Sequence, residues 1–211
     1  MASKADRGHD PSGNLEPWVA KTRMTMGMTY FKRYRMEIPL DRDFTVPQAL
    51  PPGYSLLPWS AELLEAHAAA KYHSFEYEID ANVFPCFNEY EGCLRLMREI
   101  TRRETFIAES TWLLQYQGID GSAPQACGTI QGVENRPGCG AIQNVGVIPE
   151  HRGLGLGTHL IHAALNSFRA RRLTTATLEV TMQNRGALRL YERLGFYRVK
   201  TVYKVADVAL A

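Results

Sequence analysis

Three glycines at alternate positions stand in the stretch VGVIPEHRGLGLGTHLI, which covers residues 145–161. Glycine is costly in an ordered chain because it loses more backbone freedom on folding than any other residue. Arg152 precedes these glycines, and apolar residues at helical spacing follow them as far as Phe168. The pattern predicts a strand, a glycine turn and a helix whose first backbone N–H groups are bare. Such a turn binds anions, and its size suits a pyrophosphate group.

Two nucleotide-binding motifs also place glycines before a helix. A P-loop needs a lysine after its last glycine to reach the phosphates, but Thr158 takes that position and no lysine is near. A dinucleotide-binding turn needs the spacing G-x-G-x-x-G in an early strand–helix–strand unit, whereas this loop comes late in the chain. Glu179 stands where a ribose-binding acid is expected, although it falls inside a predicted strand and not at its end. Both motifs are therefore disfavoured.

The composition is typical of a globular protein with one domain. The chain has 211 residues, of which 45% are hydrophobic and 22% charged, and its net charge is +2. This charge is too small to predict nucleic-acid or acidic-membrane partners, and no run approaches the roughly 20 apolar residues of a membrane span. The polar N-terminus lacks the apolar core of a signal peptide. Four scattered cysteines without a C-x-x-C motif indicate free thiols, so we expect a cytoplasmic protein without a bound metal.

Turn signals and hydrophobic patterns predict the order of the elements. Three strands separated by turn clusters lie between residues 110 and 147, and helices are expected to start near residues 60 and 88. A helix, a strand, a second helix ending at Gly195 and a last strand follow the glycine turn. The predicted class is α+β, with a mixed, mostly antiparallel sheet of about 6–7 strands and about four flanking helices. Residues 1–50 are predicted to be an extension, partly disordered with a basic strand or arm, and residues 51–211 a single domain.

Two motifs resemble those of the GCN5-related N-acetyltransferases (GNAT). In that family's acetyl-CoA motif V-x-P precedes [RQ]-x-x-G-x-[GA], and Arg152, Gly155 and Gly157 take the three motif positions. The stretch NRGALRLYERLGF, residues 184–196, resembles the second motif, N-x-x-A-x-x-x-Y-x-x-x-G-F. The two motifs stand in the family's order and at its usual separation. The resemblance covers residues 105–204.

This resemblance implies a three-layer fold whose sheet is splayed open by a bulge in the strand that ends at Val147. It also implies acetyl-CoA as cosubstrate, no metal, and direct transfer of the acetyl group to an amine within a ternary complex. Tyr191 takes the family's position for the acid that protonates the leaving thiolate. The residues implied for cofactor binding are Val145, Val147, Arg152, Gly153, Leu154, Gly155, Leu156, Gly157, Thr158 and Asn184.

The general base and the acceptor site are less defined by the sequence. Glu134, at the end of a predicted strand, is a candidate base, and Glu76 and Glu78 are others. Between Tyr72 and Leu94 the chain has five acids, interleaved aromatics and no lysine or arginine. An acidic groove for a cationic amine, with Glu76 and Glu78 as substrate-binding residues, is one hypothesis, and an exposed acidic loop is the other.

The acceptor is therefore expected to be a small or peptidic amine, and the protein a possible homodimer. A non-catalytic acyl-CoA-binding or regulatory module of the same fold is the alternative function. A dinucleotide-dependent oxidoreductase is a third hypothesis. An intact Tyr191 favours the enzyme, whereas the unassigned base keeps the non-catalytic alternative open.

Overall fold

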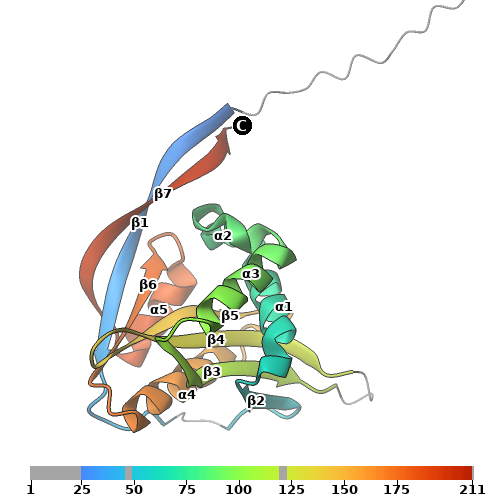
Figure 1. The fold of residues 1–211 in the computed structure, drawn as a ribbon, viewed down its shortest axis with the longest axis vertical. Coiled ribbons are helices and arrows are strands. Elements are labelled where there is room, and N and C mark those ends of the chain that lie inside the picture. Colours follow the sequence, from blue (N-terminus) through green and yellow to red (C-terminus); the bar gives the residue numbers. More distant parts are fainter. Residues whose placement is uncertain (1–24, 46–48, 119–122, 211) are drawn as a thin grey trace, which may run out of the picture.

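The computed structural model describes residues 25–45, 49–118 and 123–210. Its seven-stranded sheet has the order β2-β3-β4-β5-β6-β1-β7 (Figure 1). The strands are β1 (Thr25–Pro39), β2 (Tyr54–Pro58), β3 (Phe106–Tyr116), β4 (Gln125–Arg136), β5 (Cys139–Val147), β6 (Thr175–Thr181) and β7 (Tyr197–Leu210). The α-helices are α1 (Leu64–Phe75), α2 (Ile79–Val83), α3 (Tyr90–Thr101), α4 (Leu156–Ala170) and α5 (Arg185–Leu194). Among the strands of the described residues only β5 and β6 pair in parallel, so the predicted mixed, mostly antiparallel sheet is confirmed.

Helices cover both faces of this sheet and form three layers. The apolar stripe of α4, including Leu160, Ile161 and Phe168, is fully buried in the main core, which Leu188 and Tyr191 of α5 also join. On the other face α1 and α3 form a second core, in which Phe75 stacks on Phe87. In the described residues no helix is long and apolar enough to cross a membrane.

The strand predicted in the first 50 residues is present as β1, and it lies inside the sheet. It pairs with β6 from Arg33 to Pro39 and with β7 from Thr25 to Glu37. One side of β1 places Met36 and Ile38 in the main core, while the other side carries Arg33 and Arg35. The predicted extension 1–50 thus shares one sheet with the predicted domain 51–211, because β6 would otherwise expose an unpaired edge. The disorder predicted near the N-terminus falls outside the described residues.

The predicted bulge is also present and it opens the sheet. Asn144 and Val145 of β5 stand opposite a single residue of β4, and Asn144 has a left-handed φ of 48°. Pairing between β5 and β6 stops at Ala141, so the two strands separate from there towards Val147. A Cβ atom on Gly146 would lie 2.6 Å from Cβ of Ser74, so this glycine permits the close approach of α1.

Lys71 on α1 is fully buried, and its ammonium nitrogen has no hydrogen-bond partner among the described residues. Burial lowers the pKa of Lys71 from 10.5 to about 7. Because the unfolded chain then binds the proton more tightly, this group adds stability as the pH rises from about 7 towards the unfolded pKa near 10.4. We expect Lys71→Met to raise Tm by roughly 2–6 °C at pH 7 and by less at pH 10. Thermal unfolding at both pH values checks this, and an unchanged Tm at pH 7 would contradict it.

Candidate active site

A cavity of about 830 Å³ extends along the end of β5, the glycine turn and the exposed side of α5. This volume lies within the range of about 300–1,000 Å³ that is usual for ligand pockets. Leu154 is the one residue of the predicted cofactor set that does not line it, since its exposed side chain lines a neighbouring cavity. The other predicted residues line the larger cavity together: Val145, Val147, Arg152, Gly153, Gly155, Leu156, Gly157, Thr158 and Asn184.

The glycine turn leaves the start of α4 open to this cavity. Gly153 and Gly155 have left-handed φ angles of 81° and 76°, and a Cβ atom on either would meet nothing within 4 Å. The backbone conformation, and not crowding, therefore requires glycine at these positions. Gly155 is the N-cap of α4, and no side chain caps the helix. The first backbone N–H groups, with the partial positive charge of the helix, are thus available to an anion.

Arg152 is not a free cation at the mouth of the cavity. Its Nε donates a hydrogen bond to the carbonyl oxygen of Val147 at 2.9 Å, and its Nη2 donates to that of Ser74 at 3.0 Å. Its Nη1 lies 2.5 Å from a carboxylate oxygen of Glu78. Arg152 therefore ties the end of β5 to the end of α1, and Glu78 places a negative charge beside the anion-binding turn.

Three arginines that the sequence analysis did not single out supply further positive charge. Arg185, Arg189 and Arg193 stand four residues apart on α5, and all three line the larger cavity. Residues at this spacing share one face of a helix. The spacing was visible in the sequence, but only the packing of α5 beside the glycine turn shows that this face lines the cavity.

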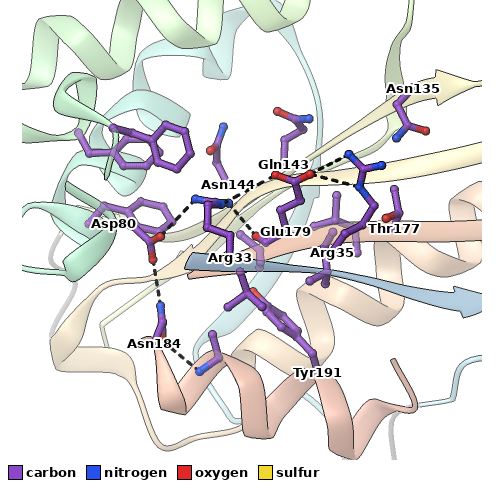
Figure 2. Close-up of a pocket in the computed structure, with 18 residues that line it drawn as sticks. Arg33, Arg35, Asp80, Asn135, Gln143, Asn144, Thr177, Glu179, Asn184 and Tyr191 are labelled. Atoms are coloured by element: carbon purple, nitrogen blue, oxygen red, sulfur yellow. Dashed lines mark hydrogen bonds and ion pairs between the residues drawn. The ribbon is translucent and has the colours of Figure 1, made fainter. Parts of the chain in front are cut away.

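A second cavity, which we call the polar pocket, lies where β5 and β6 have separated (Figure 2). Its volume is about 220 Å³. Charged and amide side chains dominate its lining: Arg33, Arg35, Asp80, Asn135, Gln143, Asn144, Glu179 and Asn184. The polar pocket and the larger cavity share the residues Phe75, Val145, Asn184, Ala187 and Tyr191. Ligands in the two cavities would therefore meet beside these residues.

Asp80 is held in the polar pocket by three partners. Thr181 donates its hydroxyl to Asp80 Oδ1 at 2.7 Å, and Asn184 donates its amide to Oδ2 at 3.0 Å. Arg33 Nη1 lies 3.8 Å from Oδ1. The side chains of Arg33 and Asp80 are both largely buried. A buried charge is tolerated only when it is paired and hydrogen-bonded. Asp80 thus links α2, β6, β1 and the start of α5.

Glu179 on β6 faces the two arginines of β1. Arg35 donates two hydrogen bonds, from Nε and Nη2, to one carboxylate oxygen of Glu179 at 3.2 and 3.0 Å. Arg33 Nε lies 3.9 Å from the other oxygen, and Arg33 Nη2 donates to the backbone carbonyl of Glu179 at 3.1 Å. Figure 2 shows these side chains side by side in the pocket. Neither arginine was predicted as a site residue. Their positions at every second residue of β1 indicate a strand, but not that this strand pairs with β6.

Tyr191 lines both cavities from α5, and only 7% of its surface is exposed. Burial raises the pKa of its phenol above the ordinary value, and the charge of Asp80 adds to this effect. The phenol therefore stays protonated at neutral and mildly alkaline pH. A neutral phenol at this junction can donate a proton to an anion formed there.

The structure does not bring Glu134 to the site. Its carboxylate accepts a hydrogen bond from the backbone N–H of Gly138 at 3.0 Å and so closes the turn between β4 and β5. Glu134 lines neither the larger cavity nor the polar pocket. A proton acceptor must lie within hydrogen-bond reach of the proton, directly or through a water molecule, so the geometry does not support Glu134 as the base.

The acids of the segment between Tyr72 and Leu94 do not form a common groove. Glu76 contacts His73 at 3.2 Å and lines neither cavity, while Glu78 lines the larger cavity and not the polar pocket. Asp80 alone of the five lines the polar pocket. The geometry therefore gives no support to a shared acceptor groove at Glu76 and Glu78, whose carboxylates contact His73 and Arg152.

Comparison with known proteins places this geometry in a family. The profile of the "Acetyltransferase (GNAT) family" matches residues 66–196. The chain belongs to this family. It is 37% identical over 65 residues to N-alpha-acetyltransferase 30 of Schizosaccharomyces pombe, which covers 31% of this chain and 43% of that protein. It is also 49% identical over 59 residues to mycothiol acetyltransferase of Thermobispora bispora, covering 28% of this chain and 20% of that protein.

Solved structures of the GNAT family share the fold. A GCN5-related N-acetyltransferase from Sphaerobacter thermophilus has a TM-score of 0.61 at 22% identity, and the match covers 87% of this chain and 53% of that one. The ribosomal-protein-S18-alanine N-acetyltransferase of Escherichia coli has a TM-score of 0.54 at 15% identity, with 75% and 96% covered. The chain spans less than half of the length of the two sequence relatives above.

Proposed function

We propose that this protein is an acetyl-CoA-dependent N-acetyltransferase in which an amine attacks the thioester directly within a ternary complex. The observation that carries this proposal is the meeting of the larger cavity and the polar pocket at Val145, Asn184 and Tyr191. The larger cavity would hold acetyl-CoA, which GNAT enzymes use, and the polar pocket would hold the amine. Membership of the GNAT family supports the donor and the type of reaction.

In this proposal the donor is bound mostly by backbone groups. β5 has no partner strand on its β6 side beyond Ala141, so the amide arm of pantetheine can pair with the backbone between Val145 and Val147. The pyrophosphate would accept hydrogen bonds from the open N–H groups of the turn between Gly153 and Gly157. The arginines of α5 would add a screened, long-range attraction for the phosphates.

Tyr191 and the splayed strand would carry the acyl transfer. The amine nitrogen forms a bond to the carbonyl carbon, the carbon–sulfur bond breaks, and coenzyme A leaves as a thiolate. Tyr191 donates its phenol proton to that thiolate and is reprotonated by the proton that the attacking nitrogen loses as the amide forms. This proton is distinct from the one that the ammonium form of the acceptor loses before the attack. A backbone N–H near Val147 stabilises the negative charge that develops on the carbonyl oxygen.

We propose Glu179, in place of Glu134, as the acceptor of the amine proton, directly or through a water molecule. Glu179 lines the polar pocket, and 38% of its side chain is exposed, so it can exchange the proton with solvent. Asp80 is less suited, because only 13% of its side chain is exposed and Thr181, Asn184 and Arg33 surround its carboxylate. Asp80 is better described as a residue that positions Arg33 and Asn184.

An acetyl-CoA turnover assay against a panel of small amines tests the proposed function. Release of the coenzyme A thiol that depends on the amine, with the acetylated amine identified by mass spectrometry, is the expected result. Binding of acetyl-CoA without turnover of any amine would contradict the enzyme and favour the non-catalytic acyl-CoA-binding module. A larger thermal shift with NAD(P) than with acetyl-CoA would contradict both.

Glu78→Gln is expected to strengthen acetyl-CoA binding by about 3- to 10-fold. Glu78 places a carboxylate beside the anion-binding turn and competes with phosphate for Arg152, so removing its charge lowers repulsion and frees the guanidinium. Isothermal titration of acetyl-CoA into both proteins measures Kd. Glu76→Gln is the matched control, because Glu76 lies outside both cavities, and it should leave Kd unchanged. Weaker binding by Glu78→Gln would show that the ion pair builds the site.

A further inference from the structure

We propose that the acceptor amine itself carries a carboxylate, and that Arg35 binds this carboxylate in the polar pocket. This inference rests on the proposed function and names the class of its acceptor, a small amino acid in zwitterionic form. The observations that carry it are the free hydrogen-bond donors of Arg35, the charge balance of the pocket and its size.

Arg35 has exposed donors left for a ligand, whereas both terminal nitrogens of Arg33 donate within the protein and its Nε, which has no hydrogen bond to a described residue, is buried. Both hydrogen bonds of Arg35 go to one oxygen of Glu179, and among the described residues its Nη1 has no partner. Glu37, the next acid on this side of β1, pairs with Arg136 at 3.0 Å and does not occupy Arg35. The Arg35 side chain is 40% exposed, so a ligand can reach it. A guanidinium with free donors binds a carboxylate through charge-assisted, frequently bidentate hydrogen bonds.

The register of β1 and β6 places Arg35 at a distance from Tyr191 that a small amino acid can span. Arg33 stands opposite Thr181, at the level of Asp80 and near Tyr191, while Arg35 stands opposite Glu179, two residues further along. Two residues of strand correspond to roughly 7 Å. An amine held beside Tyr191 would therefore lie a short carbon chain away from a carboxylate held by Arg35.

The charges of the pocket favour a zwitterion over a polyamine. Its charged lining consists of two guanidinium groups, on Arg33 and Arg35, and two carboxylates, on Asp80 and Glu179. A ligand with one ammonium and one carboxylate keeps this site neutral, whereas a second ammonium would face the guanidinium groups without compensation. The volume of about 220 Å³ also restricts the acceptor to a small molecule.

Matched acceptors test this proposal. In the wild-type protein we expect kcat/KM for glycine, β-alanine or 4-aminobutyrate to exceed that for the corresponding carboxamide by about 10- to 100-fold in at least one pair. Arg35→Ala should reduce this ratio to about twofold or less by raising KM for the carboxylate alone, and Arg35→Lys should restore part of it. Arg95→Ala, an exposed arginine paired with Glu89 on α3, is the control and should keep the ratio.

Equal rates with each carboxylate and its carboxamide would overturn the proposal, and so would a preference that survives Arg35→Ala. Titration of the same amino acids into the protein saturated with coenzyme A separates this proposal from the proposed function. Binding that depends on Arg35 without any turnover would sustain the carboxylate site and contradict the acetyltransferase. Turnover of amines without regard to a carboxylate would sustain the acetyltransferase and contradict the carboxylate site. If the amino acids were neither bound nor acetylated, both the carboxylate site and the acetyltransferase would be contradicted.

Discussion

Replacing Tyr191 by phenylalanine is expected to lower kcat by about 100- to 1,000-fold, with little change in KM for acetyl-CoA. Phenylalanine keeps the packing of the ring in the main core and against Phe196 but removes the proton donor at the junction of the two cavities. Steady-state kinetics with a saturating amine measures the effect. Because burial raises the pKa of Tyr191, the wild-type rate should not fall through loss of this proton up to about pH 10.

Tyr203→Phe serves as the matched control for this variant. Tyr203 lies on β7 and is 65% exposed, so loss of its hydroxyl should leave kcat unchanged. Undiminished turnover in Tyr191→Phe would remove Tyr191 as the acid. A parallel fall in Tm would instead show that the hydroxyl supports the fold, so both variants need a thermal unfolding measurement.

Replacing Arg33 by alanine is expected to lower the free energy of unfolding by about 3–5 kcal/mol and to abolish turnover. The substitution leaves Asp80 buried without its cation and removes a contact to Glu179 between β1 and β6. Urea unfolding followed by circular dichroism measures the loss. Lys200→Ala, at an exposed position of β7, is the control and should cost less than about 0.5 kcal/mol.

A double-mutant cycle with Asp80→Ala separates the interaction energy of the Arg33–Asp80 pair from the other effects of each substitution on stability. If Arg33 and Asp80 stabilise each other, the double variant should be at least about 1 kcal/mol more stable than the sum of the single losses predicts. Additive losses would contradict this expectation, because they would show that the two charges do not interact. Asp80 would then not explain why an arginine of β1 is buried.

The glycine turn and the bulge could be predicted from the sequence because their signals are local. The glycines of the turn, the helix pattern after them and the residues of the second motif lie within short stretches, and local backbone preference decides their conformation. Gly153 and Gly155 do adopt left-handed φ, and the predicted bulge is at Asn144 and Val145. The exception is Leu154, whose side chain points to the neighbouring cavity.

The polar pocket could not be predicted because long-range pairing builds it. Arg33 and Arg35 line it only because β1 inserts between β6 and β7. Both arginines are more than 140 residues away in sequence from Glu179. Asp80 sits on α2, a five-residue helix too short to give a periodic signal. A run of acids gives no indication of which one has a buried partner, so Glu76 and Glu78 could not be told from Asp80 in advance.

Initial-rate kinetics with acetyl-CoA and an accepted amine varied together test the central claim most directly. Direct attack at the junction of the two cavities requires both ligands to be bound at once, so double-reciprocal plots should give intersecting lines. Mass spectrometry of the protein incubated with acetyl-CoA alone should show no added acetyl group. Parallel lines together with an acetylated protein would contradict the account, since they would show that the acetyl group passes through a covalent enzyme intermediate.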